Sequence, residues 1–92
     1  MIQFLIHEKS DTVGVATMDI KAGGDAEGLF MDSQETIKVK ALKDIPLGHK
    51  IALGDAKAGD TVIKYGQDIG KVVADFQKGD HVHIHNLKTK RW

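Results

Sequence analysis

The stretch that decides the fold is 75-DFQKGDHVHIHN-86, a glycine turn that runs directly into an alternating segment. Its first half follows the pattern D-x-x-x-G, in which an aspartate side chain caps the turn and the glycine takes a positive φ. Successive side chains of a strand point to opposite faces, so His81, His83 and His85 share one face. Val82 and Ile84 share the other face. We therefore expect the apolar face to lie on a core and the imidazole face to look into a cleft.

The same turn pattern occurs at three earlier places in the chain. These copies are 19-DIKAG-23, 44-DIPLG-48 and 55-DAKAG-59. The last two are followed, like the copy at 75–79, by an apolar alternating segment, at residues 49–53 and 61–65. The repeating unit is thus a turn and then a strand. Its irregular spacing excludes a solenoid, and we interpret the repeated aspartates and glycines as structural.

The rest of the chain also predicts short strands. Residues 1–8 and 13–16 are apolar segments, and residues 29–42 have the period and turn of a hairpin centred on 31–34. Residues 51–58 are compatible with one helical turn. The sequence predicts a single domain over residues 1–92, mainly β, with short strands and at most short helical turns.

Composition narrows the class of protein. The 92 residues carry zero formal net charge, with 41% hydrophobic and 28% charged residues and no cysteine. The chain has no basic patch of the kind that nucleic acid requires, and no disulfide framework or thiolate metal site. The apolar run at residues 2–6 is too short for a membrane span and lacks the features of a signal peptide. We expect a cytoplasmic domain that binds neither nucleic acid nor membranes.

The histidine face predicts a metal or acid–base site, because neutral imidazole is a common metal ligand and proton carrier. Residues i and i+2 of a strand lie roughly 6.6 Å apart, so His81/His83 or His83/His85 can share an ion, but three in a row cannot easily do so. Further ligands would come from His49, His7 or a partner chain. A lone histidine such as His7 is otherwise best interpreted as a rim residue. The alternative is a surface strand whose histidines have no function.

Polar side chains also lie beside glycines at the predicted strand ends. They are His49, Lys50, Lys64 and Tyr65. Sites are often built on strand-end loops, where a glycine lets the backbone approach a ligand. Each lysine has the simpler interpretation of a solvated charge.

Three motifs carry a family resemblance. They are 48-GHKIAL-53, 62-VIKYG-66 with 69-IG-70, and 79-GDHVHIHN-86. In this order they resemble the N-terminal domain of the altronate and galactarate dehydratase family. The resemblance extends from the opening strand to Asn86 and implies the SAF-type β-clip fold.

The two ends of the chain narrow the type within that family. The segments 4-FLIHEK-9, 11-DTVGVA-16 and 86-NLKTKRW-92 are most similar to small subunits of two-chain members that eliminate sulfite from (2R)-3-sulfolactate to give pyruvate. The resemblance implies a small subunit, inactive alone, that works with a large catalytic subunit on a small sulfonated substrate. The close alternative is the small subunit of an altronate or galactarate dehydratase, which eliminates water from a sugar acid. A second alternative is a stand-alone SAF-type ligand-binding module.

The resemblance also implies roles for the polar residues. Iron(II) or another divalent metal is expected, bound mainly by the large subunit, with His83 and His85 as metal or substrate ligands. His49 is the candidate for proton transfer or a third contact. The remaining predicted contacts are to substrate: Lys50 or Lys64 to its carboxylate or sulfonate, Tyr65 beside them, and Asn86, which would also orient a histidine.

Overall fold

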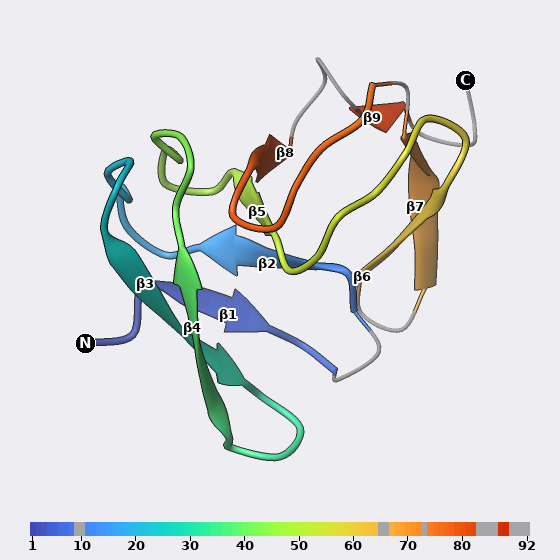
Figure 1. Ribbon diagram of the computed structural model, residues 1–92. Helices are drawn as coiled ribbons and strands as arrows, with labels where there is room; N and C mark the ends of the chain where they lie inside the picture. The colour runs from blue at the N-terminus through green and yellow to red at the C-terminus, as the bar shows by residue number, and fades with distance from the viewer. Residues whose placement is uncertain (9–10, 65–66, 73, 83–86, 89–92) are drawn as a thin grey trace.

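The computed structural model describes residues 1–8, 11–64, 67–72, 74–82 and 87–88 (Figure 1). For residues 62–64, 67–70 and 87–88 the description is of the backbone only. Within these ranges the strands are β1 (Phe4–Ile6), β2 (Val13–Ala16), β3 (Asp25–Phe30), β4 (Thr36–Lys40), β5 (Lys50–Ala52), β6 (Thr61–Lys64), β7 (Gln67–Val72), β8 (His81–Val82) and β9 (Leu87–Lys88).

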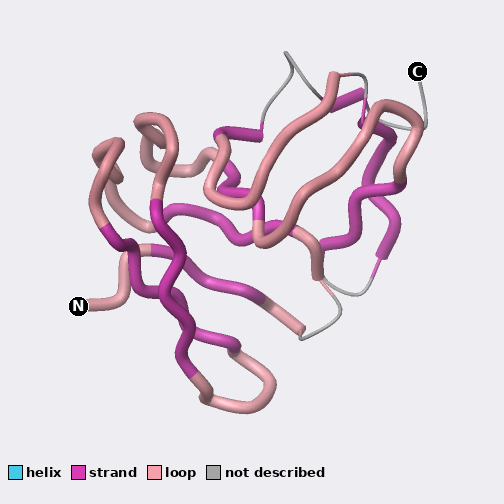
Figure 2. The backbone as a smooth tube through the Cα atoms, viewed as in Figure 1, coloured by secondary structure: helices cyan, strands magenta, loops and turns pink. Residues whose placement is uncertain are grey.

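These strands form two sheets. Six of them follow the order β4-β3-β1-β2-β5-β8, and the other three follow the order β6-β7-β9. The described pairs are antiparallel except β1 and β3, which run parallel with Phe4 opposite Gly28. Long loops connect short strands, and the described residues contain no helix (Figure 2). The prediction of a mainly β fold is therefore confirmed.

The segment 51–58 does not form the helical turn that its sequence allows. Its first residues belong to β5, and Ala56 forms an isolated bridge with Phe76. Pairing with distant strands satisfies this backbone better than a single turn of helix, which fixes several residues for one hydrogen bond.

No helix among the described residues is long and apolar enough to cross a membrane.

The predicted hairpin is formed by β3 and β4. Its first strand begins at Asp25, four residues before the expected start. The turn is closed by the Gln34 amide, which donates to the Phe30 carbonyl at 2.8 Å, and Gln34 has a φ of 64°. Val39 is buried while Lys38 and Lys40 are exposed, so the predicted alternation of β4 is confirmed.

Two glycines make room for the central aromatic ring of the core. Phe4 is fully buried in β1, between Gly14 on β2 and Gly28 on β3. A Cβ built at Gly14 would lie 2.7 Å from the Phe4 ring, and one built at Gly28 would overlap that ring. A residue larger than glycine could therefore occupy position 14 or position 28 only if the Phe4 ring repacked.

Gly28→Ala is expected to lower the free energy of unfolding by about 1–3 kcal/mol, because the added methyl group overpacks the Phe4 ring. Urea denaturation checks this value. Gly54→Ala is the matched control, since a Cβ built at Gly54 meets nothing within 4 Å. Equal stability of the two variants would contradict the packing that we describe.

The four D-x-x-x-G turns associate in two reciprocal pairs. In the first pair, Ile20 and Ile45 exchange backbone hydrogen bonds of 2.9 and 2.8 Å. Asp19 accepts from the Leu47 amide and Asp44 accepts from the Ala22 amide, both at 2.9 Å. Each aspartate thus caps the partner turn, not its own.

The second pair repeats this arrangement residue for residue. Ala56 and Phe76 exchange backbone hydrogen bonds of 2.8 and 2.9 Å. Asp55 accepts from the Lys78 amide at 2.8 Å, and Asp75 accepts from the Ala58 amide at 2.7 Å. The glycines of all four turns have positive φ, between 84° and 98°, as predicted.

Asp44→Ala is expected to destabilise the chain by about 0.5–2 kcal/mol, the usual cost of losing a side-chain cap on a backbone N–H. Asp44→Asn is the control, because the amide oxygen still accepts from the Ala22 amide. Thermal denaturation of the two variants compares them. An asparagine variant as unstable as the alanine variant would show that the cap does not account for the loss.

Strand β5 lies between two buried clusters. Its Ile51 packs with the cluster around Phe4, and its Ala52 packs with a second cluster that includes Phe76 and Val82. The alternation of a strand places these neighbours on opposite faces, so both clusters hold β5 in place. His49 lies directly before the start of this strand.

Candidate functional site

Two histidines meet where β5 and β8 pair. Ile51 lies directly opposite His81 across the antiparallel ladder, so the two side chains share one face. His49 precedes β5 and has the same parity as Ile51, which places it on that face too. Val82 lies on the opposite face and is fully buried, as predicted for its strand.

The two imidazoles are in direct contact. His49 Nδ1 lies 2.7 Å from His81 Nε2, a hydrogen-bond distance. The ring centroids are 5.0 Å apart and the ring planes differ by 25°, so the rings lie edge to edge along the hydrogen bond and are nearly coplanar. Both residues are partly buried. The site thus holds two hydrogen-bonded imidazole rings, whose nitrogens can accept, donate or pass on a proton.

The local sequence explains why His49 can take this role. In the equivalent turns Asp60 and Asp80 occupy the place of His49, and their carboxylates accept from the Lys57 and Gln77 amides at 2.9 and 3.4 Å. In the His49 turn the donor position is occupied by Pro46, which has no N–H. The turn therefore needs no carboxylate there, although its backbone bond from the His49 amide to the Pro46 carbonyl is kept at 3.0 Å.

An ion pair fixes the backbone that enters β8. The Asp80 side chain is only 14% exposed, and its Oδ1 lies 3.5 Å from Lys43 Nζ. The same oxygen accepts from the His81 amide at 3.1 Å. Asp80 thereby joins the loop that carries Lys43 to the strand that carries His81.

The structure separates the other predicted contacts. Lys50 lies in β5 between His49 and Ile51, so the strand places it on the opposite face from the histidine pair. Lys64 ends β6, where only the backbone is described. His7 lies at the other end of the sheet, past β1, with its Nδ1 3.7 Å from a carboxylate oxygen of Glu8, and it does not join the site.

Four predicted site residues lie outside the described residues. They are Tyr65, His83, His85 and Asn86. Their assignments stay predictions.

The described residues do not by themselves complete a metal site. They contain no group of three or more His, Cys, Asp or Glu side chains placed to hold an ion. The histidine pair offers two nitrogens 2.7 Å apart. Two nitrogens on one tetrahedral ion, with bonds of about 2.1 Å, lie roughly 3.4 Å apart. The pair is therefore arranged for a hydrogen bond and not for joint coordination.

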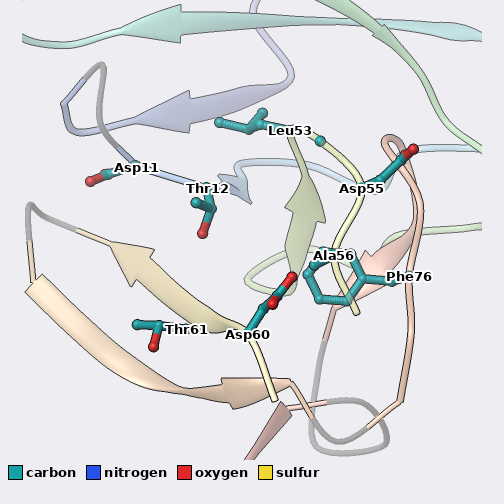
Figure 3. A pocket seen from close by; sticks show the side chains of 9 residues that line it. Asp11, Thr12, Leu53, Asp55, Ala56, Asp60, Thr61 and Phe76 are labelled. Atoms are coloured by element: carbon teal, nitrogen blue, oxygen red, sulfur yellow. The ribbon is translucent and has the colours of Figure 1, made fainter. Parts of the chain in front are cut away.

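A cavity of about 360 Å³ lies elsewhere, with three carboxylates in its wall (Figure 3). They belong to Asp11, Asp55 and Asp60, and Phe76 adds an apolar surface. Neither His49 nor His81 lines it. Its negative lining makes it unsuitable for an anionic acid substrate, which favours the histidine pair as the candidate site.

Comparison with known proteins defines the family. The model of the altronate/galactarate dehydratase SAF domain matches residues 2–90. The chain therefore belongs to the altronate/galactarate dehydratase SAF-domain family.

The chain is also similar to particular proteins. The chain is 45% identical to (2R)-sulfolactate sulfo-lyase subunit alpha of Chromohalobacter salexigens, over 99% of this chain and 98% of that relative. It is 64% identical to the subunit of the same name from Paracoccus pantotrophus, over 60% of this chain and 82% of the relative. Altronate dehydratase of Bacillus subtilis is 39% identical over 97% of this chain, which matches only 17% of that protein.

Sequence reasoning missed the partnership of His49 with His81. His49 was considered as a further ligand beside a His81/His83 pair, but a direct hydrogen bond between His49 and His81 was not predicted. The available signal was the equivalence of the turns at 44–48 and 75–79, each of which leads a histidine into the next strand. That equivalence does not predict which strands lie side by side.

Proposed function

We propose that this chain is the small subunit of a two-subunit carbon–sulfur lyase that eliminates sulfite from (2R)-3-sulfolactate to give pyruvate. The observation that carries the proposal is the 45% identity to a sulfo-lyase alpha subunit across nearly the whole of both chains. The 64% identity over a shorter segment of a second alpha subunit supports it. The partner is then the large subunit of that enzyme, and the cytoplasmic location stays a prediction.

The reaction needs proton transfers that a histidine can perform. A base removes the proton from C2, the C3–S bond breaks with its electron pair leaving on sulfite, and the resulting enol takes a proton at C3 to become pyruvate. An imidazole carries protons at physiological pH, and a positioned acid or base contributes about 10²–10⁴-fold to rate. We assign His49 to one of these transfers, because its ring is held by His81 at the entrance to β5.

The divalent metal implied by the family resemblance belongs mainly to the large subunit in this proposal. When bound, such a metal stabilises negative charge on the substrate carboxylate and hydroxyl. The described residues, which do not include His83 and His85, contain no group of three or more His, Cys, Asp or Glu side chains placed to hold an ion. His83 and His85 remain the proposed contribution of this chain to the metal or the substrate.

A dehydratase is the second candidate. The 39% identity to altronate dehydratase over 97% of this chain favours it. The proton transfers would be the same, with water as the leaving group at C3.

Affinity purification of the tagged chain from its source cells, followed by assay of the eluate, tests the proposal. We expect a larger chain to copurify and the eluate to release sulfite from (2R)-3-sulfolactate. Formation of a 2-keto-3-deoxy acid from altronate or galactarate would instead support the dehydratase. A chain that purifies alone and is inactive on every substrate would contradict both and favour a stand-alone binding module.

A further inference from the structure

Because His49 and His81 share a hydrogen bond, the tautomer of one ring determines the tautomer of the other. A neutral imidazole has one N–H and one acceptor nitrogen. The bond joins His49 Nδ1 to His81 Nε2, so one of these atoms donates and the other accepts. If His49 Nδ1 donates, both rings carry hydrogen on Nδ1. If His81 Nε2 donates, both carry it on Nε2.

We propose that His81 is a positioning residue for His49, and that it holds the His49 ring in the Nδ1–H tautomer. The choice of this form over the Nε2–H form rests on the proposed function: His49 Nδ1 faces His81, so a base must act through Nε2, which has a lone pair only when the hydrogen is on Nδ1. With its hydrogen on Nδ1, His49 has its lone pair on Nε2 and accepts a proton from the reaction through that atom. The orienting partner of a functional histidine is often a carboxylate or a carbonyl, and here a second imidazole supplies the acceptor.

The backbones on both sides are rigid enough for this role. His81 stands opposite Ile51, whose side chain is fully buried, and is followed by Val82, which is fully buried too. The Ala16 amide donates to the His49 carbonyl at 2.9 Å. The hydrogen bond between the two rings, which lie edge to edge with planes 25° apart, limits rotation of either imidazole about its side-chain bonds.

Two substitutions separate the hydrogen bond from the presence of a ring at position 81. His81→Gln places an amide oxygen or nitrogen near the position of Nε2 and can keep the bond to His49 Nδ1. His81→Phe keeps a flat ring at this position but has no nitrogen. Because these variants differ mainly in one hydrogen bond, a purely structural role for His81 would not favour the glutamine over the phenylalanine.

The first readout is the tautomer of His49, from long-range proton–nitrogen NMR spectra of the full chain at about pH 8, where an ordinary imidazole is neutral. We expect His49 and His81 in the Nδ1–H form. We expect His49 to keep that form in His81→Gln and to lose it in His81→Phe. His7, which lies at the other end of the sheet, is the internal reference. Nε2–H in both rings, or a His49 tautomer that ignores both substitutions, would overturn the proposal.

The second readout is catalysis by the assembled complex. His81→Phe is expected to lower kcat by about 10–100-fold with little change in KM, as loss of an orienting partner does, and His81→Gln should restore most of it. Equal kcat losses in the two variants would contradict a positioning role. If the wild-type complex proves inactive on every substrate, the proposed function fails while the tautomer measurement still decides on the pair.

Discussion

Replacing His49 by alanine is expected to lower the turnover of the assembled lyase by about 10²–10⁴-fold, the usual contribution of a positioned acid or base. The imidazole lies at the entrance to β5, in contact with His81 at 2.7 Å, and the proposed reaction requires proton transfer at C2 and C3. Its side chain is not used to cap its own turn, since that turn has Pro46 at the donor position. Sulfite release under saturating substrate measures the effect.

The matched control is His7→Ala, which removes a histidine from the far end of the same sheet. We expect this variant to assemble with the large subunit and turn over like the wild type. Circular dichroism should show that both variants keep the β fold. Full turnover by His49→Ala would remove His49 from the mechanism, and equal losses in the two variants would point to damage unrelated to the site.

Gly79→Ala is expected to cost about 4 kcal/mol or more, enough to unfold much of a domain of this size. Gly79 has a φ of 88°, where an L side chain is strained, and a Cβ built on it would overlap the backbone carbonyl oxygen of Lys40. Its carbonyl also accepts from the Leu42 amide at 2.9 Å. The turn that contains Gly79 and the end of β4 at Lys40 must therefore move apart. His81, which follows Gly79 by two residues, would move with the turn.

Gly59→Ala is the control because Gly59 occupies the same place in the equivalent turn. It has a φ of 98°, but a Cβ built there meets nothing within 4 Å. We expect only the cost of a left-handed conformation, about 1–2 kcal/mol. Urea denaturation compares the two variants. A Gly79→Ala variant as stable as Gly59→Ala would show that the close approach to Lys40 is not a constraint on the fold.

The local features of the fold could be predicted from the sequence because they depend on near neighbours. The alternation around Val39 predicted the hairpin strand β4, and the D-x-x-x-G pattern predicted the positive φ at Gly23, Gly48, Gly59 and Gly79. The burial of Val82 opposite the histidine face followed from the two-residue period of a strand. Each of these results follows from a few adjacent residues.

The long-range pairings could not be predicted in the same way. The reciprocal capping of one turn by the aspartate of another depends on which turns associate, and four similar turns allow several pairings. The contact between His49 and His81, which are 32 residues apart in the chain, likewise depends on β8 pairing with β5. Each of the two segments predicted a histidine at the site. The hydrogen bond between the two histidines, however, depends on which strands pair in the sheet.

The role of this chain in the lyase is tested most directly by titrating the purified chain into its separated large subunit and measuring sulfite release from (2R)-3-sulfolactate. We expect little release by either chain alone and a rate that rises with added chain until the large subunit is saturated. The same titration with His49→Ala should saturate at a far lower rate. Full activity of the large subunit alone, or no activity at any ratio, would show that this chain is not a working part of the lyase.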